Sequence, residues 1–198
     1  MTCRSLLLCL AALLGQAVTA TAEDGKEKSV PCAACHGADG NSIAPIWPNL
    51  AGQHPQYLVA QLQAFKTGAR QDPSMTAMVA PLGDADMQDI ATYFASSQPA
   101  INSIEVLQVT AGEWLYRGGN PASGLPACMA CHGPNGAGNA LAKYPALRGQ
   151  NFDYVVKQLR DYRDRNRTTD VNETMQTISQ RMTVEEMESV ARYMSALH

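Results

Sequence analysis

The sequence carries little charge and few aromatic side chains for its length. Of 198 residues, 17 % are charged and 6 % are aromatic, and the formal net charge is -3. The 15 basic residues are outnumbered by 18 acidic ones, so the excess of Lys and Arg that marks nucleic-acid-binding proteins is missing. No low-complexity tract occurs and 45 % of the residues are apolar, which excludes a largely disordered chain.

Long apolar runs are missing as well, apart from one near the N-terminus. Arg4 precedes a short apolar run over residues 6–14, and small residues follow as far as Ala22. This order predicts a cleavable secretory signal peptide over residues 1–22, with an uncleaved N-terminal anchor as the alternative. No later stretch approaches the roughly 18 apolar residues of a membrane span, so we expect a soluble or peripheral mature protein in an oxidising compartment.

Cysteine is too scarce for a disulfide scaffold in a chain of this size. Six cysteines occur, and Cys3 and Cys9 fall inside the predicted signal peptide. The others form two Cys-x-x-Cys-His motifs, made of Cys32, Cys35 and His36 and of Cys128, Cys131 and His132. The chemistry of these cysteines therefore has to be inferred from the spacing within each motif.

The two motifs belong to a longer internal repeat whose offset drifts from 96 to 100 residues. Matched positions, first copy before second, are Gly40 and Gly136, Pro48 and Pro145, Gln53 and Gln150, Tyr57 and Tyr154, Met75 and Met175, and Tyr93 and Tyr193. A period near 100 residues is too long for a solenoid and indicates two tandem homologous domains. We predict a first domain over 23–98, a linker over 99–110 and a second domain over 111–198. The second domain should open with a helix over 111–118 whose counterpart in the first domain is truncated.

Within each copy the apolar spacing is helical. Apolar residues recur at intervals of three and four, as in Leu58, Leu62 and Phe65. No alternating run of β-branched residues is present, so strands are not expected. Each domain is predicted to be a small all-α unit of three or four helices, with a thin core that needs something to pack around.

Two thiols three residues apart, followed directly by an imidazole, fit covalent attachment of c-type haem. One helical turn can present both sulfurs to the porphyrin, with the adjacent histidine under the iron as proximal ligand. A closed zinc site would need two Cys-x-x-Cys pairs in one place, whereas each pair here has its own repeat and its own histidine. A redox dithiol would adjoin a βαβ pattern, which the sequence lacks. The prediction is one covalent haem per domain, with zinc and a dithiol as alternatives.

Each haem iron needs a sixth ligand, and a methionine thioether is the usual partner of histidine in electron-carrying cytochromes. Some methionines lie on apolar helix stripes or align with Leu or Ile in the other repeat, namely Met78, Met87, Met182, Met187 and Met194. Met75 and Met175 instead match each other, in segments expected to be irregular. We therefore predict the axial pairs His36 with Met75 and His132 with Met175, with apolar core packing of the two methionines as the alternative.

Prolines follow both motif histidines at similar distances. Pro48 and Pro145 come 12 and 13 residues after His36 and His132. Because a haem-ligating histidine normally donates its other ring N–H to a fixed acceptor, the backbone carbonyls of these prolines are the predicted acceptors, with ordinary loop prolines as the alternative. Of the two remaining histidines, His54 is expected at the surface and the C-terminal residue is expected to be exposed.

Around these motifs the sequence resembles the cytochrome c4 family over essentially the whole mature chain. The similar segments are Cys32 to Ser42, Pro48 to Gln53, Pro126 to Asn139 and Asn166-Arg167-Thr168. The resemblance implies a periplasmic dihaem electron carrier, often membrane-associated, that feeds a terminal oxidase. It also implies His/Met ligation of both irons by the residues named above, and two domains whose haem propionate edges face each other.

Iron with both axial positions filled has no open site, so we predict an electron carrier and not an enzyme. The expected partners are redox proteins, with a quinol-oxidising complex or a dehydrogenase as donor and a terminal oxidase as acceptor, together with peripheral membrane association. The alternatives are a cytochrome subunit of a dehydrogenase, such as a sulfide-oxidising flavocytochrome, and a dihaem peroxidase.

The two predicted domains differ in charge. Residues 23–97 hold four basic and eight acidic residues, a balance of -4, whereas residues 111–198 hold ten basic and nine acidic residues, a balance of +1. Positive surroundings disfavour ferric iron, so we expect the second haem to have the higher potential and to receive electrons from the first. Salt screens exposed charges beyond about 10 Å, which keeps the expected difference modest.

Overall fold

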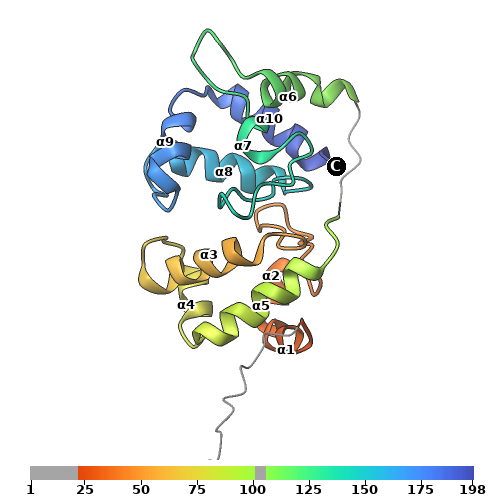
Figure 1. Ribbon diagram of the computed structural model, residues 1–198, viewed down its shortest axis with the longest axis vertical. Coiled ribbons are helices and arrows are strands. Elements are labelled where there is room, and N and C mark those ends of the chain that lie inside the picture. The colour runs from red at the N-terminus through yellow and green to blue at the C-terminus, as the bar shows by residue number, and fades with distance from the viewer. Residues whose placement is uncertain (1–21, 101–105) are drawn as a thin grey trace, which may run out of the picture.

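The structure is a computed structural model that describes residues 22–100 and 106–198. The two repeats form two helical domains stacked along the long axis of the molecule (Figure 1). The described residues contain no strand longer than an isolated bridge, and those bridges join Asn120 to Leu125 and Asn139 to Tyr144. The predicted fold class, two tandem all-α domains, is confirmed.

The helices follow the same order in both domains. The first domain contains α1 (Ala22–Lys28), η1 (Val30–Cys32), α2 (Ala33–His36), α3 (Pro55–Thr67), α4 (Pro73–Val79) and α5 (Asp84–Ser96). The second contains α6 (Val106–Gly118), α7 (Met129–His132), α8 (Phe152–Arg163), η2 (Val171–Glu173), α9 (Thr174–Ser179) and α10 (Val184–Ala196). α6 begins at Val106, five residues before the predicted helix start, and it is 13 residues long where its counterpart α1 has seven. The predicted signal peptide over 1–22 lies almost wholly outside the described residues.

Local sequence signals set where these helices begin and end. α3 starts with Pro55 at its first position and stops at Gly68, whose φ of 79° is costly for any residue with a Cβ. α10 begins with a capping box, in which the Thr183 hydroxyl accepts from the Glu186 N–H while the Glu186 carboxylate accepts from the Thr183 N–H. These caps fix the loops that enter the helices.

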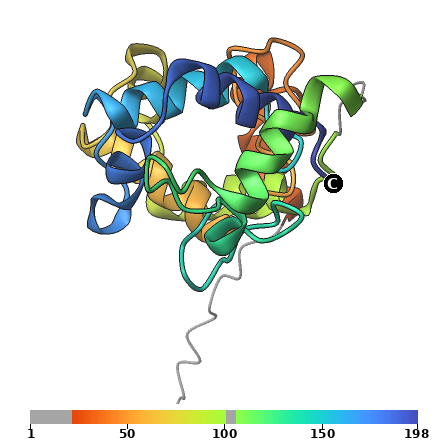
Figure 2. The same ribbon diagram turned by 90° about the horizontal axis from the view of Figure 1, so that it is seen from above.

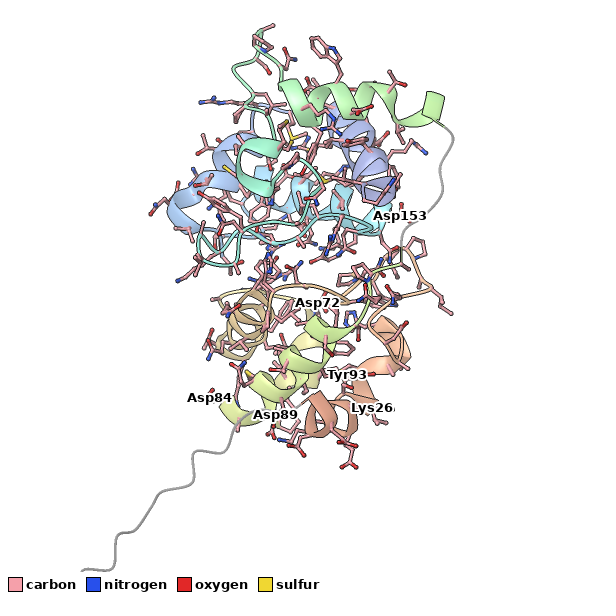
Figure 3. All side chains as sticks on the ribbon, turned by 45° about the vertical axis from the view of Figure 1, so that its right-hand side comes forward. Lys26, Asp72, Asp84, Asp89, Tyr93 and Asp153 are labelled. Atoms are coloured by element: carbon pink, nitrogen blue, oxygen red, sulfur yellow. The ribbon has the colours of Figure 1, made fainter. Side chains whose placement is uncertain are left out.

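A glycine lies where the first and last helices of each domain cross. A Cβ at Gly25 of α1 would lie 2.1 Å from the Asp89 carbonyl oxygen, and one at Gly112 of α6 would lie 2.0 Å from the Ser189 carbonyl oxygen. Asp89 and Tyr93 of α5 are labelled beside α1 in Figure 3. Only glycine allows the two helices to approach so closely. The same crossing therefore closes both domains.

The predicted apolar stripes form the cores. On α5, Met87, Ile90 and Phe94 are at most 3 % exposed. The equivalent stripe of α10 is also buried and consists of Met187, Val190, Ala191 and Met194. Seen from above, the helices run around the perimeter of the molecule (Figure 2). No helix in the ranges 22–100 and 106–198 is long and apolar enough to cross a membrane.

The domains meet through a reciprocal set of hydrogen bonds. The Gln53 side chain donates to the Ala146 carbonyl and accepts from the Ala146 N–H, both at 2.9 Å. The Gln150 side chain makes the same pair with Asn49, at 2.9 and 2.8 Å. Because Gln53 matches Gln150 and Asn49 matches Ala146 in the repeat, the two contacts are equivalent and exchange when the domains are exchanged. The two domains are thus related by an approximate two-fold axis.

Candidate haem sites

Each Cys-x-x-Cys-His motif occupies one helical turn. α2 and α7 are four residues long, each preceded by the first cysteine of its motif in helical conformation, and Gly37 and Gly133 end them with φ of 77° and 79°. The turn therefore carries both sulfurs and the imidazole of its motif, as the spacing predicts. All four motif cysteines are free thiols. In the described part of the chain no three His, Cys, Asp or Glu side chains form a group that could hold a metal ion, so the zinc alternative has no ligand set there.

The cysteines lie in partly apolar surroundings. Burial raises the pKa of the Cys32 thiol and raises that of Cys128 to about 11. A reactive dithiol instead lowers the pKa of its nucleophilic cysteine so that a thiolate is present near neutral pH. These two thiols are protonated at neutral pH, which disfavours the dithiol alternative.

Both motif histidines are buried and held by a backbone carbonyl. His36 is 6 % exposed and His132 is 7 % exposed. Their Nδ1 atoms lie 2.9 Å from the carbonyl oxygens of Pro48 and Pro145. A carbonyl only accepts, so Nδ1 carries the proton and Nε2 keeps the lone pair that an iron needs. The predicted histidine–proline contacts are confirmed in both domains.

Burial also keeps these imidazoles neutral. Removal from water lowers the pKa of both His36 and His132, and the carbonyl hydrogen bond opposes this only in part. A neutral imidazole with a fixed tautomer is the form that binds iron.

Met75 and Met175 occupy equivalent positions, but not in irregular segments as predicted. Each lies in the first turn of a short helix, α4 or α9. The Asp72 carboxylate accepts from the Met75 N–H at 3.1 Å, and the Asp170 carboxylate accepts from the Met175 N–H at 2.7 Å. The Asp72-Pro73 pair is a helix-start signal that the sequence interpretation did not weigh. Both methionine side chains are partly buried, and Met175 packs against the second core.

The other methionines lie where the repeat comparison put them. Met78 is 39 % exposed, whereas Met182 is 6 % exposed within the second core. Met87, Met187 and Met194 are buried core residues, at 4 % exposure or less. Met129 is also partly buried, at the first position of α7, but the matching position of the first repeat is Ala33. Among the methionines in the described ranges, the pair Met75 and Met175 is therefore distinguished by its match in the repeat. Iron ligation by this pair stays a prediction.

The remaining histidines differ from each other. The expectation of a surface position is wrong for His54, which precedes α3, is half-buried and has a buried Nε2 with no hydrogen-bond partner. Its backbone N–H donates at 3.0 Å to Gln53, an interface residue, and its repeat partner Asn151 donates to the Trp47 carbonyl of the other domain at 2.7 Å. His198 is exposed, as expected.

Comparison with known proteins agrees with this geometry. The Cytochrome c family model matches the chain twice, over residues 22–98 and 115–198. Cytochrome c4 of Pseudomonas aeruginosa is 44 % identical over 98 % of this chain and 97 % of its own length. The crystal structure of reduced recombinant cytochrome c4 from Pseudomonas stutzeri is 42 % identical, covers 91 % of this chain and 100 % of that chain, and superposes with a TM-score of 0.87. A thiosulfate dehydrogenase electron acceptor of Thiomonas intermedia is 36 % identical over 85 % of this chain and 79 % of its own length.

The donor set in each domain fits a covalently bound haem. Two thiols in one turn and a buried neutral imidazole with its Nδ1–H already bonded are the groups that covalent attachment and proximal ligation of a haem require. Since this set occurs once in each half of a chain that matches the Cytochrome c family twice, the chain belongs to the cytochrome c4 family and is a dihaem c-type cytochrome that transfers electrons.

Proposed function

We propose that the chain carries electrons in the periplasm from a quinol-oxidising complex or a dehydrogenase to a terminal oxidase, with no substrate chemistry of its own. The observation that carries this proposal is the equivalent placement of Met75 and Met175, each at the start of a short helix held by an aspartate. A histidine and a methionine at both irons leave no open coordination position, which suits one-electron transfer.

The proposed covalent attachment uses Cys32 and Cys35 in the first domain and Cys128 and Cys131 in the second. The proposed axial pairs are His36 with Met75 and His132 with Met175. When bound, each haem supplies a one-electron couple between ferric and ferrous iron.

The protein's own part is to hold these ligands and exclude water. The Pro48 and Pro145 carbonyls fix the proton on Nδ1 of each histidine and so set the orientation of the ring. Partial burial of the methionine side chains limits competition by water for the sixth position, and thioether ligation raises the potential.

A second candidate is an electron acceptor dedicated to one dehydrogenase. Similarity to the thiosulfate dehydrogenase electron acceptor of Thiomonas intermedia favours it. So does a 31 % identical structure of thiosulfate dehydrogenase from Marichromatium purpuratum, with a TM-score of 0.79 over 89 % of this chain and 40 % of that one. A cytochrome subunit of a sulfide-oxidising flavocytochrome belongs to the same class of function. A dihaem peroxidase needs one iron with a displaceable ligand, which the paired methionines disfavour.

Stopped-flow reduction separates these candidates. The oxidised full-length protein is mixed with membranes that contain quinol, and separately with a dehydrogenase and its sulfur substrate. Rapid reduction by the membranes, followed by oxidation through a terminal oxidase, supports the carrier. Reduction by the dehydrogenase alone supports the second candidate, and peroxide turnover contradicts both. N-terminal sequencing of the periplasmic protein tests removal of residues 1–22.

A further inference from the structure

Two arginines, one from each domain, lie together in the interface. Arg70 follows α3 and is 9 % exposed, and Arg167 follows α8 and is 4 % exposed. They match in the repeat, as do Gln61 of α3 and Gln158 of α8. α3 and α8 face each other across the interface in Figure 1. The repeat therefore brings two copies of one polar pair to the same place.

The two guanidinium groups share their hydrogen-bond acceptors. The Gln61 Oε1 atom accepts from Arg70 at 2.7 Å and from Arg167 at 2.9 Å. The Gln158 Oε1 atom accepts from Arg70 at 2.8 Å and from Arg167 at 2.7 Å. Each arginine thus donates to the glutamine of its own domain and to that of the other, which makes a closed ring of four side chains. We call Gln61, Arg70, Gln158 and Arg167 the interface ring.

Every further partner of the ring is also neutral. Arg70 donates to the Tyr154 hydroxyl at 3.1 Å and Arg167 to the Tyr57 hydroxyl at 2.8 Å. Each guanidinium also lies over an aromatic ring, that of Phe65 or Tyr162, at 4.6 Å from the centroid. Among the described residues, neither guanidinium forms an ion pair with a carboxylate.

Two positive charges are therefore buried together, and the side chains of the described residues that they contact are all neutral. Arginine does not lose its proton in proteins, so the charge remains at every pH of interest. The phenol of Tyr154 responds to it. Burial raises the pKa of this group, but the charges of Arg70 and Arg167, the Arg70 hydrogen bond and the charge of Lys157 together lower the pKa below its ordinary value. The interface thus holds a positive potential that belongs to both domains.

The ring is also close in sequence to both proposed methionine ligands. Arg70 precedes Met75 by five residues and Arg167 precedes Met175 by eight, in the segments that enter α4 and α9. Oxidation adds a positive charge to haem iron, and a buried positive charge nearby opposes that step because the interior screens it weakly.

We propose that the interface ring is a shared tuning site, in which Arg70 and Arg167 together raise the reduction potentials of both haems. A charge change on either side of the interface then shifts both potentials, because each acceptor is bonded to both guanidinium groups. This inference rests on the haem ligation proposed above. It differs from the effect of exposed charges, which act mainly on their own domain.

Gln61→Glu and Gln158→Glu test the proposal with almost no change of shape. Each adds one carboxylate between the two guanidinium groups, cancels part of their charge and keeps the acceptor oxygen that both guanidinium groups use. The matched control is Gln63→Glu, which makes the same charge change on an exposed position of α3. Arg70→Gln and Arg167→Gln remove charge instead and predict the same direction, with the exposed Arg165→Gln as their control.

The measurement is a spectroelectrochemical titration of the full protein, with haem content and the sulfur-to-iron charge-transfer band recorded on each sample. In each ring variant the reduction potentials of both haems should fall. At the wild-type midpoint potential, the ferric-to-ferrous ratio of each haem should therefore rise about threefold or more, whereas the controls should change this ratio little. Unchanged potentials, or a shift confined to the mutated domain, with the band intact, overturn the shared tuning site. Absence of the band from the wild-type protein instead overturns the proposed ligation.

Discussion

In the second domain, the first helix is held by apolar packing, whereas in the first domain it is held by charge. Counted from the crossing glycines, Leu115 and Tyr116 of α6 correspond to Lys28 and Ser29 of the first domain. Leu115 and Tyr116 are 7 % and 0 % exposed, and the Tyr116 ring packs against that of Tyr193 at 5.3 Å.

The first domain replaces this packing with an ion-pair cluster. The ammonium group of Lys28 lies 2.9 Å from the Asp86 carboxylate and 2.5 Å from that of Asp89, both on α5. Part of the missing aromatic volume comes from α5 itself, where Phe94 is buried at the position that Met194 holds in the second domain. The same haem-binding frame is thus built once on an extended apolar core and once on a smaller core with surface charge.

The two domains also differ in the size of their apolar cores. The first core cluster is built on Leu58, Ile90, Ala91 and Phe94, whereas the second extends over α6, α8 and α10. Because buried apolar area supplies most of the folding free energy, the first domain depends more on its haem to complete its core.

Loss of haem attachment should have the largest effect and should differ between the domains. Cys35→Ala and Cys131→Ala should each weaken or abolish attachment in their own domain only, which intact mass detects as loss of one haem unit. The first domain should then become sensitive to proteases, while the second, with its larger core, should keep more of its protection. Equal protection of the two haem-deficient domains would contradict the contrast, and a mature protein with zinc and no haem would contradict the haem assignment.

Loss of either proposed methionine ligand should have the same effect in both domains. Met75→Ala or Met175→Ala should remove half of the sulfur-to-iron charge-transfer band and lower the potential of that haem, because a thioether favours ferrous iron. Visible spectra and redox titration measure both changes. The exposed Met78→Ala is the matched control. If that substitution, or Met182→Ala, removed the band instead, the repeat comparison would have chosen the wrong pair.

Shortening a side chain of the first helix to alanine should destabilise the second domain more than the first. Leu115→Ala leaves a cavity in a packed core and should cost about 2–5 kcal/mol of unfolding free energy. The equivalent change in the first domain, Lys28→Ala, removes two ion pairs from a partly exposed lysine and leaves no core cavity, so it should cost less. Thermal unfolding followed by circular dichroism compares the two, and an equal loss would show that the ion pairs hold α1 as firmly as packing holds α6.

Acid should weaken the first domain before the second. The hydrogen bond from Lys28 lowers the pKa of Asp86 below its ordinary value of 3.8. A carboxylate with a depressed pKa in the folded state contributes stability above its unfolded pKa and loses it as pH falls through the folded pKa. Below about pH 4 the α1–α5 contact should therefore loosen, which hydrogen exchange of α1 amides can follow, and high salt at neutral pH should do the same. Lys28→Ala should abolish both responses.

The smallest expected effect is the order of the two potentials. Net charge favours a higher potential for the second haem, by a modest amount because most of the charges are exposed and screened. Titration of the two methionine variants assigns each potential to its haem. A higher potential for the first haem at low salt would refute the charge argument.

Much of each site could be predicted because it is local or repeated. Cys32, Cys35 and His36 share one turn, so their spacing alone places them together. The duplication also indicates the Pro48 and Pro145 carbonyls as acceptors, since these prolines follow the motif histidines by 12 and 13 residues, and both hydrogen bonds are present.

The interface could not be predicted in the same way. The repeat shows that Arg70 matches Arg167, but it does not show that the two meet, because their contacts join residues 84 to 110 positions apart. The interface positions of Gln53 and Asn151 were hidden in the same way, since hydrophobic periodicity describes a face of one domain and not what covers that face. The start of α4 was missed for a different reason, because its signal lies in the cap at Asp72 and not in periodicity.

Redox titration of the purified full-length protein, followed by visible and near-infrared spectra, tests the central claim most directly. The account predicts two haems per chain, both low-spin in the ferric state and both with the sulfur-to-iron charge-transfer band, that reduce in two one-electron steps. A high-spin ferric component, a band of half the expected intensity or a single haem per chain would contradict paired His/Met ligation.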